Sequence, residues 1–90
     1  MLTTHGNLEK RNAIFALEKR IEDMHGEFHK FRHGQLGRVP NWERLERDLI
    51  SFSAKKIQDL ELAKHLDRVL YKFQNRKRIW LRWIEEVHRG

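Results

Sequence analysis

A basic segment rich in aromatic residues, from residue 68 to residue 82, is the part of the sequence best suited to chemistry. It contains six Lys and Arg and no Asp or Glu, and aromatic side chains are interleaved with the cations. Guanidinium and ammonium groups bind phosphate oxygens, and an amide such as that of Asn75 can read the edge of a base. The sequence therefore predicts a nucleic-acid-binding face that consists of Arg68, Lys72, Asn75, Lys77, Arg78 and Arg82.

The spacing of apolar residues places part of this face on one side of a helix. Apolar residues between 62 and 87 recur at alternating steps of four and three, with Arg76 at one of these positions. Such steps define one stripe of an α-helix, and Arg68, Arg78 and Arg82 fall on the opposite side. An arginine stripe of this kind is typical of a phosphate-binding helix, but also of the solvated outer face of a helical bundle.

A second constellation is the set Glu22, His25 and His29, which recurs at intervals of three and four residues. This spacing brings three metal-ligating groups onto one face of a helix, as in the carboxylate and histidine sites of di-metal bundles. A matching set on a second helix is missing, because Glu61 and His65 have a different spacing. We therefore regard the three residues as weak candidates for a metal site, and we expect no metal and no cofactor.

Catalytic chemistry has little support in the sequence. The chain has no Cys, which excludes thiol nucleophiles, disulfides and Cys-ligated metals. No Ser lies in a Gly-flanked nucleophile elbow, and no Gly-rich loop is followed by the Lys-Ser/Thr of a phosphate-binding loop. We expect a protein that is not an enzyme.

Two long segments with helical spacing surround the one cluster of turn-forming residues. The predicted elements are a helix over residues 8–33 capped by Asn7, a turn over 34–40, and a second helix over 41–88 capped by Asn41. The apolar register of the second segment slips at residues 51–55. This slip indicates either a kink in one continuous helix, which we favour, or a break that starts a third helix.

The predicted fold class is all-α: a long antiparallel, coiled-coil-like hairpin, with a three-helix bundle as the alternative. At about 1.5 Å per residue, the first arm covers the second only to about residue 66. We therefore expect self-association, most simply as a homodimer, through an apolar interface made of Val69, Phe73, Trp80, Trp83, Ile84 and Val87. Arg76 shares their stripe, and we expect it to extend to solvent, to pair with an acid such as Glu18 or Glu22, or to be rotated away by a kink.

Length and charge bound the remaining possibilities. The chain has 90 residues and a net charge of +6, so one small basic domain is expected. No apolar run could span a membrane, and the first residues lack the features of a secretory signal, which favours a cytoplasmic protein.

The predicted function is a non-catalytic basic module that binds nucleic acid. The alternative is a helical adaptor or subunit of a larger protein assembly, with Phe73, Trp80 and Trp83 as anchors in the groove of a helical partner.

Overall fold

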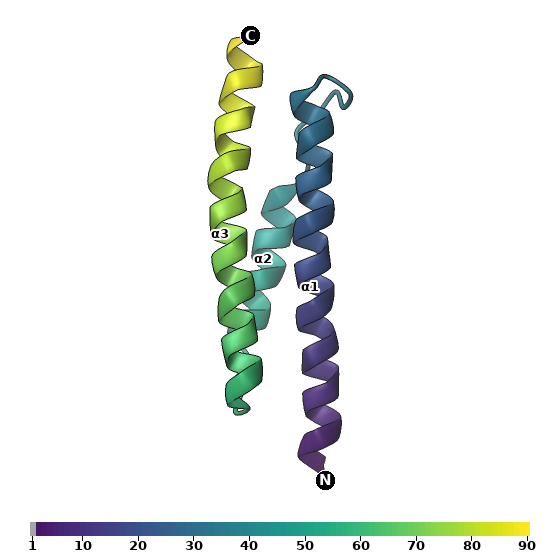
Figure 1. The fold of residues 1–90 in the computed structure, drawn as a ribbon, viewed down its shortest axis with the longest axis vertical. Coiled ribbons are helices and arrows are strands. Elements are labelled where there is room, and N and C mark those ends of the chain that lie inside the picture. Colours follow the sequence, from purple (N-terminus) through teal and green to yellow (C-terminus); the bar gives the residue numbers. More distant parts are fainter. Residues whose placement is uncertain (1) are drawn as a thin grey trace.

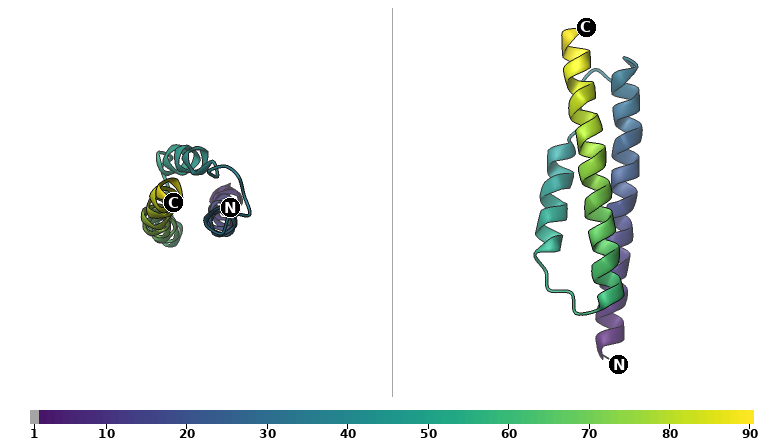
Figure 2. Two further views of the ribbon diagram at one scale, coloured as in Figure 1. Left: turned by 90° about the horizontal axis from the view of Figure 1, so that it is seen from above. Right: turned by 60° about the vertical axis from the view of Figure 1, so that its left-hand side comes forward.

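The computed structural model describes residues 2–90, and their side chains from Asn7 onward. It contains three α-helices: α1 (Leu2–Arg32), α2 (Trp42–Ser53) and α3 (Leu60–Arg89). The predicted all-α class is confirmed. Figure 1 shows that α1 and α3 lie side by side and run in the same direction, while the shorter α2 runs in the opposite direction. Seen from above in Figure 2, the three helices form a triangle, so that the molecule is an elongated bundle.

The prediction of one continuous second helix is wrong, and the three-helix alternative describes the chain. Helix α2 ends at Ser53, where the backbone N–H groups of Ala54 and Lys55 bond back to the last turn. A new helix then begins at Leu60, because the carboxylate of Asp59 accepts a hydrogen bond from the Leu62 backbone at 3.0 Å. The sequence contains no Gly or Pro at this point, and the register slip was its only sign of the break.

The start of the first helix also differs from the prediction. Helix α1 begins at Leu2, and Asn7 lies within it rather than capping it. The Asn7 side chain instead donates a hydrogen bond to Asp59 Oδ2 at 3.4 Å, and so links α1 to the beginning of α3. The predicted cap of α2 is confirmed, since the Asn41 side chain accepts from the Arg44 backbone at 3.2 Å.

Helix α1 ends in a turn that needs a glycine. Gly34 has a φ of 76°, in the left-handed region that residues with a Cβ rarely adopt. The backbone N–H of Gln35 bonds to the Lys30 carbonyl at 2.8 Å, and that of Gly34 to the Phe31 carbonyl at 3.2 Å. This pair of bonds is a Schellman motif, which satisfies the last carbonyls of α1 and directs the chain into α2.

The core consists of the apolar stripes of all three helices. Phe28 of α1 and Trp80 of α3 are fully buried and stack at a ring distance of 5.0 Å, and Phe73 lies edge-on to Trp80 at 5.9 Å. The buried apolar residues are Ile14, Leu17, Ile21, Phe28, Phe31, Leu45, Leu49, Leu66, Val69, Phe73, Trp80 and Trp83.

The tryptophan-bearing half of α3 therefore has a partner within its own chain, contrary to the argument for self-association. Val69, Phe73, Trp80 and Trp83 are all buried in the single chain. The physical reason is that α2 carries the chain back toward the bottom of the bundle, and the break after it lets the chain reverse so that α3 runs along α1 (Figure 1). Of the six predicted interface residues, only Ile84 and Val87 retain substantial exposure.

None of the helices, over the residues described, combines the length and the apolar character that crossing a bilayer would require.

Candidate nucleic-acid interface

The exposed face of α3 carries most of the predicted nucleic-acid-binding residues. Arg68, Asn75, Arg78 and Arg82 are exposed, as predicted from their position opposite the apolar stripe. None of the three arginines forms an ion pair with a side chain in the described range 7–90. From residue 68 to residue 82 this face extends about 21 Å along the helix axis. Within the part of the chain whose side chains are described, it is a row of cations without a carboxylate partner.

The two predicted lysines are placed differently. Lys72 is half-buried, with its Nζ atom 3.2 Å from Glu18 Oε2 and 3.1 Å from Glu22 Oε2. Lys77 is also half-buried, with its Nζ atom 2.6 Å from Glu46 Oε2 and 5.1 Å from the centre of the Trp42 ring. Both ammonium groups are therefore neutralised by carboxylates on α1 or α2. They link α3 to the other two helices, and their charges are offset before a phosphate could approach.

Arg76 completes an ionic ladder between α1 and α3. Its guanidinium lies 3.1 Å from Glu22 Oε1, so pairing with an acid, one of the three predicted outcomes, is confirmed. Glu18 in turn lies 3.2 Å from His65 Nε2. Each contact joins residues about fifty positions apart in the chain, which fixes the axial position of α3 on α1.

This ladder changes the protonation of its members. The hydrogen bond from Lys72 lowers the pKa of Glu22. Partial burial opposes this shift, and the charge of Arg76 adds to it. Burial acts to raise the pKa of Glu18, but hydrogen bonds from His65 and Lys72 outweigh it, and the pKa is lowered. The two carboxylates raise the pKa of Lys72, with the hydrogen bond to Glu22 as the largest cause. All three groups are therefore charged at neutral pH.

The weak metal candidates do not converge on a common point. Glu22 is turned toward Lys72 and Arg76, whereas the Nδ1 atom of His25 accepts a hydrogen bond from Trp80 Nε1 at 3.0 Å. His29 lies edge-on to His25, with ring centres 5.2 Å apart. Among side chains 7–90, no group of three metal-ligating residues is arranged to hold an ion.

The environment of His25 is aromatic rather than metal-binding. Its ring stacks on Trp83, with centres 5.5 Å apart and planes 28° from parallel. Burial, followed by the charges of Arg76 and His29, lowers the pKa of His25, and Glu22 opposes this shift. The neutral ring therefore accepts a hydrogen bond from the Trp80 indole N–H and covers the core at this point.

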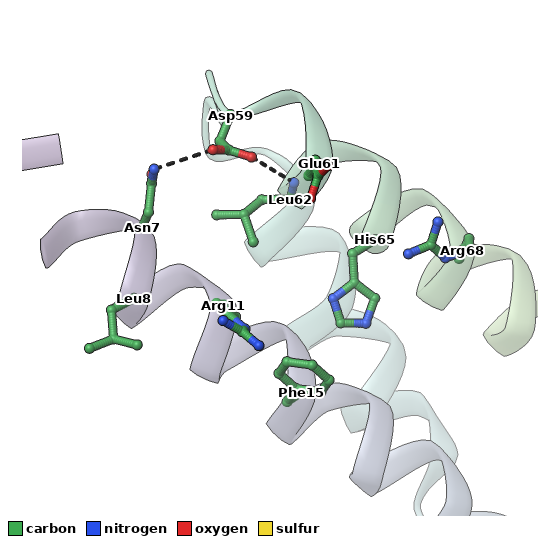
Figure 3. A pocket seen from close by; sticks show the side chains of 9 residues that line it. All are labelled: Asn7, Leu8, Arg11, Phe15, Asp59, Glu61, Leu62, His65 and Arg68. Carbon is green, nitrogen blue, oxygen red and sulfur yellow. Dashed lines mark hydrogen bonds between the residues drawn. The ribbon is translucent and has the colours of Figure 1, made fainter. Parts of the chain in front are cut away.

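Two exposed aromatic rings lie near the arginine face: Tyr71, which the sequence already places among the cations of α3, and Phe15, which sequence reasoning missed. Phe15 on α1 is 48% exposed and Tyr71 on α3 is 71% exposed. Phe15 lines a groove between α1 and the start of α3, shown in Figure 3 together with Arg11, His65 and Arg68. The signal in the sequence was an aromatic residue next to the apolar stripe, at Phe15 directly after Ile14.

The fold and this face define a small basic three-helix bundle with a row of arginines that have no acidic partner among side chains 7–90. No family model, no curated protein and no solved structure matches the chain. Its function is therefore inferred from its own residues.

Proposed function

We propose that the protein is a non-catalytic module that binds nucleic acid through the exposed face of α3. The observation that supports this proposal is the separation of the cations on α3 into two groups. Lys72, Arg76 and Lys77 pair with carboxylates of α1 and α2, whereas Arg78 and Arg82 project from the bundle without an acidic partner among the described side chains. Exposed guanidinium groups in a row suit the repeating phosphates of a nucleic acid.

The strength of the electrostatic contribution follows from the number of cations on α3 that have no acidic partner among the described side chains. Binding that neutralises Z phosphates of a duplex has a salt slope of about −0.9Z. With Arg68, Arg78 and Arg82 as three contacts, the affinity falls about 40-fold between roughly 50 and 200 mM salt. If Lys64 and Arg89, which are also exposed, contribute, the fall is about 500-fold over the same range.

Charge reversal on α3 tests this proposal. We expect the double variant Arg78→Glu/Arg82→Glu to abolish binding of a mixed-sequence DNA or RNA in a gel-shift assay, with unchanged helix content by circular dichroism. The matched control is Arg44→Glu/Arg47→Glu on α2, which changes the net charge by the same amount at two exposed arginines. Equal losses in the two double variants would show that net charge, and not the α3 face, causes binding.

An adaptor role is the rival of this proposal. Its predicted anchors Phe73, Trp80 and Trp83 lie in the core, so a partner could reach them only by displacing α1. An adaptor that used them would be indifferent to charge reversal at Arg78 and Arg82 and sensitive to Trp83→Ala. Pull-down with the two kinds of variant separates these functions.

Self-association stays a prediction, now with a different basis. Of the predicted interface residues, Val87 is 36% exposed and Ile84 is half-buried; both lie at the far end of α3, near Leu81, which is 41% exposed. A homodimer formed there would place two arginine faces in one particle and increase the avidity for a long polyanion. Sedimentation equilibrium distinguishes a species of twice the chain mass from the 11.0 kDa monomer.

A further inference from the structure

A groove between α1 and the first turns of α3 adjoins the arginine face (Figure 3). It has a volume of about 710 Å³, and its apolar lining comes from Leu8, Phe15 and Leu62. The Arg11 guanidinium lies 5.6 Å from the centre of the Phe15 ring, and the His65 ring meets the same ring edge-on at 4.8 Å. Phe15 is thus held in position by its neighbours while nearly half of it faces solvent.

Arg68 connects this groove with a second one along α3. The second groove, of about 740 Å³, has one carboxylate and three cations in its lining, which consists of Asp67, Arg68, Tyr71, Lys72, Asn75, Arg76 and Ile79. Tyr71 follows Arg68 by three residues, and His65 precedes it by three, so the side chains are neighbours on the helix surface. Arg68, which forms no ion pair among the described side chains, therefore lines the first groove together with Phe15 and the second together with Tyr71.

We infer that the two grooves form a binding path for single-stranded nucleic acid, with bases stacked on Phe15 and Tyr71 and the intervening phosphate held by Arg68. This inference rests on the proposed function and specifies its ligand. Bases in a duplex are already stacked on each other, so an exposed ring offers a duplex little, whereas an unpaired base gains a stacking partner. Asn75 continues the path with an amide that can meet a base edge.

The charges that line the first groove determine at which end the bound strand leaves it. Asp59 and Glu61 line the end of the groove at the start of α3, and Asp59 is already bonded to Asn7 and to the backbone of Leu62 (Figure 3). Two carboxylates repel phosphate oxygens, whereas Arg11 and Arg68 attract them. The strand therefore leaves the groove at its Arg68 end and continues along α3 toward Arg82.

The test compares a single strand of about 12 nucleotides with a duplex of the same sequence, both fluorescein-labelled, by fluorescence anisotropy at about 50 mM salt. Tyr71→Ala is expected to weaken single-strand binding about tenfold and to leave duplex binding within about twofold. Tyr71→Phe keeps the ring and should bind the single strand like the parent chain. Ile50→Ala, at an exposed apolar residue of α2, is the control for loss of any surface side chain.

A second variant keeps the test independent of folding effects. Phe15→Leu retains apolar bulk next to His65 but removes the aromatic face, and we expect about a tenfold loss for the single strand. Tyr71→Ala and Phe15→Leu proteins that bind the single strand as tightly as the parent, or that lose single strand and duplex equally, would overturn the inference. In either case salt-dependent duplex binding that needs Arg78 and Arg82 would leave the proposed function standing. Absence of binding to both nucleic acids would refute the inference and the proposed function together.

Discussion

The hydrogen bond from Trp80 Nε1 to His25 Nδ1 permits a sharp test of how the core is closed. Trp80 is fully buried, so its indole N–H depends on this one acceptor at 3.0 Å. Replacing His25 with Phe keeps an aromatic ring that can stack on Trp83 but removes the acceptor. We expect His25→Phe to lower the free energy of unfolding, because it leaves a buried donor unsatisfied.

The magnitude follows from the cost of an unsatisfied buried donor, which is about 1–3 kcal/mol. In a chain of this size, about 2 kcal/mol corresponds to a fall in Tm of roughly 8–16 °C. His25→Asn provides the rescue, because its amide oxygen can take the place of Nδ1 while the stacking on Trp83 is lost. That loss costs about 0.5–1.5 kcal/mol, so the Asn variant should be the more stable of the two.

The same bond makes stability depend on pH. A protonated His25 carries a hydrogen on Nδ1 and cannot accept from Trp80. Because burial, Arg76 and His29 lower the pKa of His25 below its ordinary value of 6.5, the unfolded chain takes up this proton at a pH where the folded chain does not. Stability due to this residue is therefore fully present above pH 6.5, declines as the pH falls below it, and levels off once the folded protein is protonated as well.

The assay is urea unfolding followed by circular dichroism, at pH values from about 8 to about 5. The difference in unfolding free energy between the parent chain and His25→Asn isolates the contribution of this side chain from those of the other histidines. The reasoning would be refuted by a His25→Phe variant within about 0.5 kcal/mol of the parent at pH 8. A parent-minus-Asn difference that does not change with pH would refute the linkage alone.

Three further predictions concern the turn and the ionic ladder. Gly34→Ala should destabilise the chain by about 1–2 kcal/mol in urea unfolding, because φ is 76° there; an unchanged midpoint would show that the turn relaxes at no cost. Arg76→Leu should raise Tm, because the arginine is half-buried and Glu22 keeps Lys72 as a partner. The increase should be smaller than the ~4–8 °C that corresponds to 1 kcal/mol. A lower Tm would mean that the ion pair stabilises the protein more than burial of an apolar side chain does. The pKa values of Glu18 and Glu22 are lowered, so the stability they contribute is present above pH 4.5 and is lost as the pH falls through their pKa values in the folded protein. Glu22→Gln should therefore reduce the fall in Tm that acid causes in the parent chain. The same fall in Tm in both proteins would contradict this.

Much of the core could be predicted from the sequence because heptad spacing is a local property. Ile14, Ile21 and Phe28 in the first segment, and Phe73 and Trp80 in the last, lie on the predicted stripes and are all buried. The break between α2 and α3 could not be predicted with the same certainty. It is stabilised by the packing of α3 on α1, and that contact joins residues far apart in the sequence.

The candidate site also has one part that the sequence predicts and another that only the structure shows. Exposure of Arg78 and Arg82 follows from their place opposite the apolar stripe, which the sequence shows directly. The pairing of Lys72 and Lys77 depends on which carboxylates of other helices face them, and this required the arrangement of the bundle. Phe15 was missed because, in a sequence, an aromatic residue next to an apolar stripe is interpreted as part of the core. The structure shows instead that it lines a groove.

The parallel arrangement of α1 and α3 has a consequence for how the chain acquires its structure. Glu18 meets Lys72, Glu22 meets Arg76 and His25 meets Trp80, so partners are separated by 54 or 55 positions. Helices that are consecutive in the sequence share few of the large buried rings. A segment of only two consecutive helices would therefore leave most of its apolar surface exposed to water. Closure of the whole loop must therefore precede most of the gain from packing, which favours cooperative, all-or-none folding over the stepwise addition of hairpins.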